Sequence, residues 1–153
     1  MTADENKAVV RRYYEELWNA GDLTVIDECL GPEVLAHLDG DDHVSRDGWR
    51  DVITLWRRAF PDIHHVVDRL VAEGDIVAAN IRFTGTHRGI LQLGSWGPWA
   101  PTGKAVDVKE ANFFRLAGGQ GGRVLGHLGH GHLRAATRGG PAAVGWHHHL
   151  TET

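Results

Sequence analysis

The chain has 153 residues, which suits one domain with a substantial core and is too short for two. Apolar residues make up 42% and charged residues 24%, which excludes wholesale disorder, and the formal net charge of -4 disfavours nucleic acid as a partner. Cys29 is the only cysteine, so no intramolecular disulfide forms, as expected of a cytoplasmic protein. No apolar run reaches the roughly 20 residues of a membrane span, and the charged N-terminus lacks a signal-peptide core.

Three helices are predicted in the first 60 residues. Apolar side chains at helical spacing indicate a first helix over residues 2–20, which begins with a capping box at Thr2. A short second helix fits residues 23–30. A third fits residues 46–60, where Ser45 is placed to cap it and a proline follows it.

After the third helix the apolar period changes to two. The alternation predicts strands over residues 63–71, 76–87 and 105–116. Residues 88–104 are rich in glycine, proline and tryptophan and are interpreted as a long loop. Helices followed by an antiparallel meander predict an α+β fold.

The composition breaks near residue 118. Residues 118–153 hold ten of the twenty glycines and six of the eleven histidines, and they contain no Asp, Lys, Asn, Ser, Ile, Phe or Tyr. We therefore treat residues 1–153 as a single domain whose segment 118–153 is atypical.

Six short segments in a fixed order carry a resemblance to a known family, the SnoaL-like polyketide cyclases of the nuclear transport factor two-like superfamily. No segment is specific alone, but the series covers roughly residues 5–117. The segments are residues 6–22, 59–62, 70–75, 83–87, 100–104 and 113–116.

The resemblance implies a cone-shaped barrel, in which a curved antiparallel sheet wraps around N-terminal helices and encloses an internal pocket. It also implies an enzyme of aromatic polyketide biosynthesis that works without a metal or organic cofactor. Such enzymes close a ring by intramolecular aldol condensation. A close branch is associated with hydroxylation of an anthracycline-type ring, and that reaction requires a partner reductase.

Aldol closure needs a base next to a carbonyl and stabilisation of the enolate. In the cyclases the base is an aspartate on the last strand, with a histidine and a glutamine on the strand before it. Carried over by position, the histidine falls on Asn112 and the glutamine on Glu110. Both departures weaken the match, although a buried Glu110 is itself a candidate base. The alternative is that Glu110 pairs with Arg82 or another cation across the sheet.

Further candidates for the pocket are one histidine for catalysis and several side chains for substrate binding. His87 has the strand parity of the pocket face, but a hydrogen-bonded histidine at a strand end is the favoured interpretation. His64 and His65 lie on opposite faces of one strand, so at most one points inward. Trp96 and Trp99 either stack on a flat aromatic ligand or fill space under the loop. The remaining substrate-binding candidates are His37, Phe83, Val108 and Phe114.

The C-terminal histidines have the spacing of metal ligands. Neither His127, His130 and His132 nor residues 147–149 have an acidic neighbour or a rigid frame, so no metal site is predicted there.

The resemblance further implies a homodimer packed through its sheet and a small aromatic polyketide as ligand, with no membrane partner. A protein of another class, a non-catalytic domain that binds a small molecule in the same pocket, is the alternative function.

The compositional break also suggests a shifted reading frame. Read one base out of frame, G/C-rich codons for residues 128–134 yield Trp-Asp-Thr-Ala-Thr-Phe, which resembles the family's final strand. If the frame is shifted, the printed residues of the last strand, which should bear the base, are not those that the gene encodes. His127, His130 and His132 are then not catalytic.

We expect protein expressed from the native gene to differ in mass from the printed 153 residues. Intact-mass spectrometry measures this directly. A stable, active protein with the printed mass would contradict the frameshift.

Overall fold

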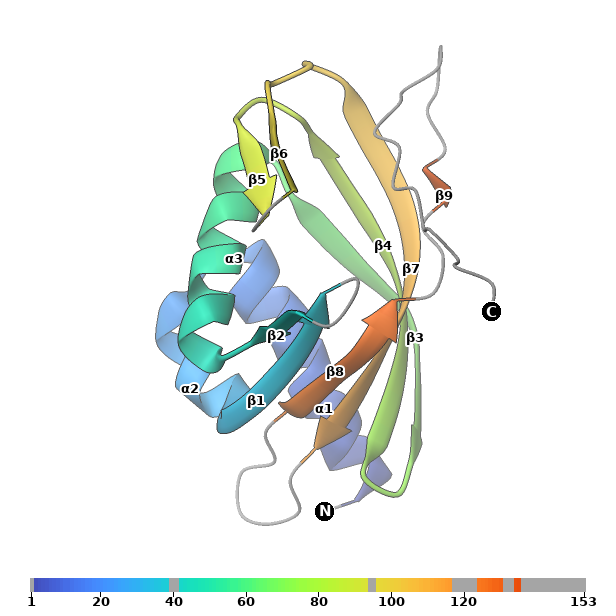
Figure 1. Cartoon of the computed structure of the whole chain (residues 1–153). Helices are drawn as coiled ribbons and strands as arrows, with labels where there is room; N and C mark the ends of the chain where they lie inside the picture. Colours follow the sequence, from blue (N-terminus) through green and yellow to red (C-terminus); the bar gives the residue numbers. More distant parts are fainter. Residues whose placement is uncertain (1, 39–41, 94–95, 117–123, 131–133, 136–153) are drawn as a thin grey trace, which may run out of the picture.

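Helices lie along one side of a curved sheet, and the sheet bends toward them (Figure 1). The computed structural model describes residues 2–38, 42–93, 96–116, 124–130 and 134–135, the last two segments and a few other residues through their backbone alone. The α+β class predicted from the helices and the alternating strands is confirmed.

The predicted first helix is one helical segment of two kinds. The α-helix α1 spans Ala3–Arg12, and the π-helix η1 continues it over Tyr13–Asn19. The capping box is confirmed: Thr2 Oγ1 accepts from the Glu5 backbone N–H at 3.2 Å, and the Glu5 carboxylate accepts from the Thr2 backbone N–H at 2.6 Å. The segment is therefore fixed at its start by local hydrogen bonds.

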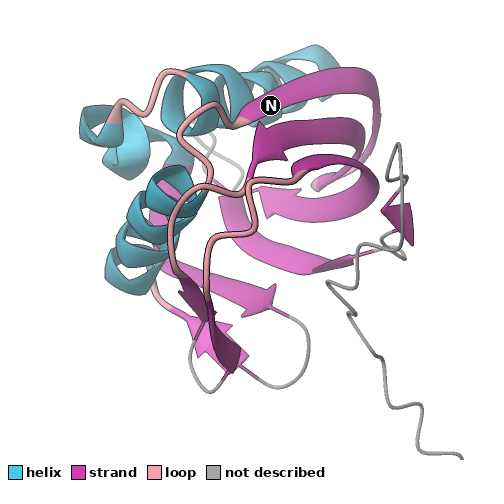
Figure 2. Cartoon of the chain, turned by 90° about the horizontal axis from the view of Figure 1, so that it is seen from above, coloured by secondary structure: helices cyan, strands magenta, loops and turns pink. Residues whose placement is uncertain are grey.

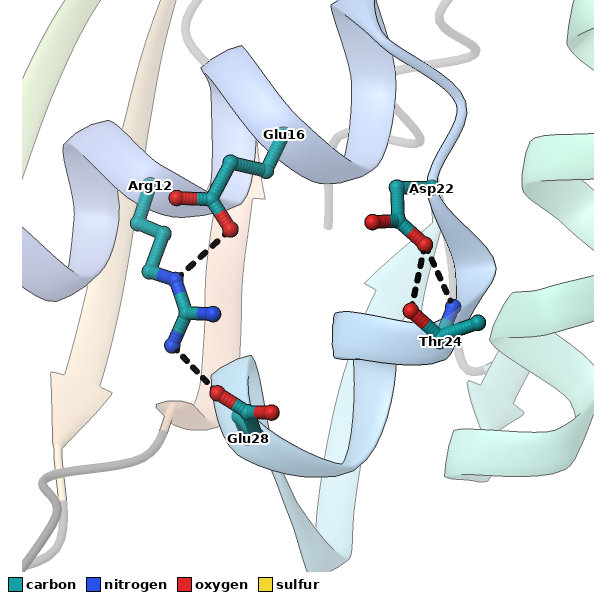
Figure 3. A network of polar contacts seen from close by, with 5 residues as sticks. All are labelled: Arg12, Glu16, Asp22, Thr24 and Glu28. Atoms are coloured by element: carbon teal, nitrogen blue, oxygen red, sulfur yellow. Dashed lines mark hydrogen bonds and ion pairs between the residues drawn. The ribbon is translucent and has the colours of Figure 1, made fainter.

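The predicted helix over residues 23–30 is shorter and begins with a 3-10 turn, η2 Leu23–Val25, followed by α2 Ile26–Cys29. Asp22 caps the turn by accepting from the Thr24 backbone N–H at 3.0 Å and from its hydroxyl at 2.5 Å. Arg12 ties this segment to the first helix, because its guanidinium contacts Glu16 at 2.7 Å and Glu28 at 2.6 Å (Figure 3).

The third helix, α3 Arg46–Ala59, begins and ends close to its predicted bounds. The Ser45 hydroxyl caps it by accepting from the Gly48 backbone N–H at 3.2 Å. Trp49 and Ile53 are buried on the face that packs toward the sheet.

Nine strands make up two sheets. The large sheet has the strand order β2-β1-β8-β7-β4-β3, with β9 paired to β7 beside this path. The pair β1 and β8 is parallel and the other pairs are antiparallel. The strands are β1 Leu30–Leu38, β2 Asp42–Val44, β3 His64–Glu73, β4 Ile76–Thr86, β5 Leu91–Leu93, β6 Trp96–Trp99, β7 Ala105–Leu116, β8 Val124–His130 and β9 Arg134–Ala135.

Two parts of the predicted order are wrong. Strands β1 and β2 lie between the second and third helices, where only helices were expected. The predicted loop over residues 88–104 contains the β5–β6 hairpin, which packs beside α3 (Figure 1). Glycine and proline in both segments hid short strands from the period-two pattern.

The sheet is curved but open in the part of the chain that the structure describes. Its strands curl toward the helices (Figure 2), and β2 and β3 form its two edges. The curved sheet around the helices therefore agrees with expectation, whereas closure into a cone-shaped barrel and an internal pocket remain predictions.

Helices and strands share one core of large apolar side chains. Leu17 and Ile26 from the helical layer and Ile81 and Phe114 from the sheet are fully buried in it. None of the helices in the described ranges has both the length and the apolar content to cross a membrane.

Candidate active site

The inner face of β7 carries the two residues predicted to do chemistry. Register pairs Glu110 with Ile81 and Asn112 with Ala79, and both of these β4 residues are buried. Since side chains alternate along a strand, Glu110 and Asn112 point toward the same core. Asn112 is buried and Glu110 is half-buried.

The predicted alternative for Glu110, an ion pair with Arg82, is not formed. Arg82 instead contacts both carboxylate oxygens of Asp107, and its Nε lies 2.7 Å from one of them. Arg82 is exposed, and this pair lies on the outer face of the sheet because Arg82 and Asp107 have the opposite strand parity from Ile81 and Glu110. Arg82 is therefore not the partner of Glu110.

One amide joins Glu110 to the helical layer. Asn112 Nδ2 donates to Tyr14 Oη at 2.8 Å and lies 3.3 Å from Glu110 Oε2. An amide nitrogen carries two hydrogens, so it can serve both oxygens. Tyr14 was predicted only as an apolar-face residue of the first helix, because a contact between residues 98 positions apart leaves no local signal.

Tyr13 and Tyr14 are neutral phenols beside this carboxylate. Burial raises the pKa of both above its usual range, and the charge of Glu110 raises it further, although hydrogen bonds partly oppose the shift. Tyr13 Oη accepts from Trp49 Nε1 at 3.0 Å. The interior therefore holds a carboxylate together with phenols that stay protonated at neutral pH.

Both tyrosines lie on the buried face of the π-helix. The Ala20 backbone N–H donates to the Glu15 carbonyl at 3.1 Å, five residues back rather than four. Four side chains of η1 are buried together: Tyr13, Tyr14, Leu17 and Trp18. Turns of this π type are rare and are often found at functional sites.

Of the two adjacent histidines, His65 is the one that points inward. Its imidazole stacks on Phe83, with ring centroids 5.4 Å apart, and also contacts Tyr14 at 5.5 Å and Trp18 at 5.1 Å. Its Nδ1 is buried and has no hydrogen-bond partner in the described part of the chain, an arrangement that costs about 1–3 kcal/mol.

Asn19 fixes the backbone of His65. The Asn19 amide donates to the His65 carbonyl at 2.8 Å and accepts from the His65 N–H at 2.7 Å. These bonds replace those of a neighbouring strand, because β3 is an edge of the sheet. The end of η1 thus positions His65 on β3.

His87 follows β4 and is also buried. Its Nδ1 lies 3.2 Å from Thr102 Oγ1, its ring stacks on Phe60 at 5.2 Å, and its backbone N–H donates to the Lys104 carbonyl at 2.9 Å. Among the described residues, no hydrogen-bond partner faces its Nε2. His87 is therefore a strand-end histidine held by hydrogen bonds, and its place in a pocket stays a prediction.

The other substrate-binding candidates lie in two different places. Phe83, Val108 and Phe114 are buried in the core, where the Phe114 ring contacts Tyr13 and Tyr14. Trp99 is 37% exposed at the end of the β5–β6 hairpin, away from this cluster in the sheet order. Only the backbone is described for His37, in β1, and for Trp96, in β6.

No group of three potential metal ligands occurs within the described ranges. Of the C-terminal histidines, His127 and His130 are described by backbone only, in β8. His132 and residues 147–149 lie outside the described residues.

Comparison with known proteins adds a family to this geometry. A family model for SnoaL-like polyketide cyclases matches residues 8–127. The chain belongs to this family. The resemblance found in the sequence is thereby confirmed.

Several solved structures are similar to this SnoaL-like chain. AclR of Streptomyces galilaeus, a proposed hydroxylase, is 28% identical over 82% of this chain and 77% of its own, with a TM-score of 0.66. A SnoaL-like polyketide cyclase candidate from Jannaschia sp. CCS1 is 27% identical over 82% and 83%, with a TM-score of 0.70. IdmH of Streptomyces antibioticus, a proposed polyketide cyclase, is 27% identical over 80% and 88%, with a TM-score of 0.64. No curated protein matches the chain.

We predict that His65 makes the fold sensitive to mild acid. Burial, with a smaller effect of His64, lowers the pKa of His65 to about 3, whereas the unfolded imidazole titrates near 6.5. Between these values the unfolded chain binds more protons, so stability falls as the pH drops through this range. The melting temperature should fall from pH 7 to pH 5 in the parent, and this fall should be smaller in His65→Phe.

The exposed neighbour His64 offers the control, since His64→Phe should retain most of the parent's dependence. Carboxylates with a lowered pKa, such as Asp22 and Asp62, take up protons only below the range from pH 7 to pH 5 in which melting is measured. Equal losses in parent and His65→Phe would contradict the assignment.

Proposed function

We propose that this SnoaL-like protein is a cofactor-independent enzyme of aromatic polyketide biosynthesis that acts on an anthracycline-type polycyclic substrate in the cytoplasm. The observation that carries the proposal is the inward Glu110 carboxylate, bonded through Asn112 to the neutral phenol of Tyr14. A base and a proton donor inside an aromatic interior are what enolate chemistry requires.

In the cyclisation reaction, Glu110 removes a proton from a carbon next to a carbonyl. The enolate carbon then attacks a second carbonyl of the same substrate and forms the new carbon–carbon bond. The proton held by Glu110 passes to the resulting alkoxide, so that the aldol product is an isomer of the substrate. Loss of water then gives the dehydrated ring.

The neighbouring groups have supporting roles in this reaction. Tyr14 stays protonated and donates to the enolate oxygen, while Asn112 holds the phenol and the carboxylate in fixed relation. Phe83, Val108 and Phe114 provide the apolar wall that excludes water. His87 acts through its available nitrogen, and the outer contacts to a flat substrate come from Trp96, Trp99 and His37.

Ring hydroxylation is the second reaction of the same site, and the likeness to AclR favours it. A substrate ring reduced beforehand to the hydroquinone by a partner reductase adds dioxygen in the interior and forms a ring hydroperoxide. This hydroperoxide loses water, so that one oxygen atom stays on the ring as a hydroxyl group and the two electrons of the hydroquinone reduce the other. Asn112 in place of the cyclase histidine is compatible with this chemistry, because an amide positions a substrate without shuttling protons. A product heavier by one oxygen separates hydroxylation from cyclisation.

A non-catalytic small-molecule-binding domain is the alternative of a different class. In this alternative, the polar groups of Glu110, Asn112 and Tyr14 and the aromatic side chains around them bind a flat ligand without converting it to a product. Buried groups that lack a partner, such as His65 Nδ1, fit this alternative as well.

A homodimer packed through the sheet completes the proposal. The outer face presents a row across three strands, in which Val71 pairs with Ala78 and Ala78 with Phe113. Val71 is 56% and Phe113 43% exposed, which is unusual for a face that stays in water.

We expect Glu110→Gln to lower product formation about 100-fold or more, because the amide cannot accept the proton. Turnover of an aromatic polyketide with an acidic methylene group is followed by mass spectrometry. Lys109→Gln, an identical replacement one residue away on the outer face, serves as the matched control. Unchanged product formation in Glu110→Gln, and in Asn112→Ala, would support the binding domain instead.

We expect light scattering to give twice the chain mass at micromolar concentration. Phe113→Asp should lower this mass toward that of one chain, because a charge in the row opposes burial. A monomeric mass for the parent protein would refute the dimer.

A further inference from the structure

His65 is a buried titratable group that the reaction above does not use. Its ring contacts the ring of Tyr14. The Asn112 amide bonds the Tyr14 hydroxyl and lies close to the Glu110 carboxylate. The imidazole is therefore next to the proposed reaction centre without taking part in its hydrogen-bond chain.

Packing alone does not explain an imidazole at this position. Its neighbours are the aromatic rings of Phe83, Trp18 and Tyr14. A phenylalanine would fill the same space without burying a nitrogen that lacks a hydrogen-bond partner among the described residues. A buried polar group with no partner among the described residues calls for an explanation, and a functional role is one of those that occur in native folds. The two hydrogen bonds from Asn19 also hold this residue in place at the sheet edge.

The chemistry around His65 favours an uncharged aromatic ligand that carries a hydroxyl group. Burial keeps the imidazole uncharged at physiological pH, so Nδ1 is either an N–H donor or a lone-pair acceptor. A phenolic hydroxyl both donates and accepts, and it therefore fits either tautomer. Flat aromatic rings also match the stacked walls of the position.

We propose that His65 is a substrate-recognition residue whose Nδ1 hydrogen-bonds a phenolic hydroxyl on the rim of the flat aromatic substrate. The inference rests on the proposed function, since it assumes a polycyclic aromatic ligand in this interior. Phe83, which covers one face of His65, packs edge-on against the half-buried Trp56. A shift of these two rings gives the ligand access to Nδ1.

The test compares two soluble probes that differ only in hydroxyl groups, 1,4-dihydroxyanthraquinone-2-sulfonate and anthraquinone-2-sulfonate. Quenching of tryptophan fluorescence gives both dissociation constants for parent, His65→Phe, His65→Asn and His64→Phe. The parent should prefer the hydroxylated probe by about tenfold, the scale of one buried hydrogen bond. His65→Phe should lose this preference, His65→Asn should regain part of it, and His64→Phe should keep it.

Melting temperatures of the same variants separate recognition from folding. Because His65→Phe removes an unpartnered polar atom and keeps the ring, it should melt no lower than the parent at pH 7. Loss of preference without loss of stability supports the inference. If His65→Phe retains the parent's preference, the inference is overturned. That result is also the one expected if an ordered water, rather than the ligand, bonds Nδ1. If the parent binds neither probe, the proposed substrate class fails and this inference fails with it.

Discussion

A single amide group determines how the helical layer and the sheet meet in this protein. Asn112 projects from β7 and bonds Tyr14 of the π-helix, and the same nitrogen lies close to the Glu110 carboxylate. All three side chains belong to an otherwise apolar interior, where an unmade hydrogen bond is expensive. The relative placement of helix and sheet is therefore set by polar groups that must find one another, in addition to the apolar packing around them.

A second connection works in the same way at the edge of the sheet. Asn19 ends the π-helix and bonds both backbone groups of His65 on β3. The two asparagines thus join one seven-residue helical segment to two different strands. Aromatic rings fill the space between these connections, from Trp49 and Tyr13 to His65 and Phe83.

Much of the fold could be predicted from the sequence, because it depends on local periodicity. The strand over residues 105–116 was predicted with the bounds that it has, and its parity placed Glu110 and Asn112 on the inner face. Strands β1 and β2 were missed, since a glycine and a proline at the start of β1 also mark the end of a helix. The π-helix was missed because its apolar positions also satisfy an α-helical pattern.

The partners of the site residues could not be predicted, for a different reason. Tyr14, Asn19 and His65 gain their roles through contacts across 46 or 98 positions of sequence. A period of two or 3.6 says which way a side chain points, but not what it meets. The position of Arg82 illustrates this limit, because a cation next to Glu110 in the strand register lies on the other face and pairs with Asp107.

The extra residue in each π turn has a consequence for the tolerance of this chain to deletion. A π turn holds about one residue more than an α-helical turn, so deleting a residue between Glu15 and Ala20 would convert it to an α-helical turn with little rotation of the segments on either side. Asn6, whose amide donates to the Gly74 carbonyl at 3.1 Å, and Arg12, paired with Glu28, lie before this turn and would keep their partners. A homologue that is one residue shorter here can therefore make the same contacts from an α-helix.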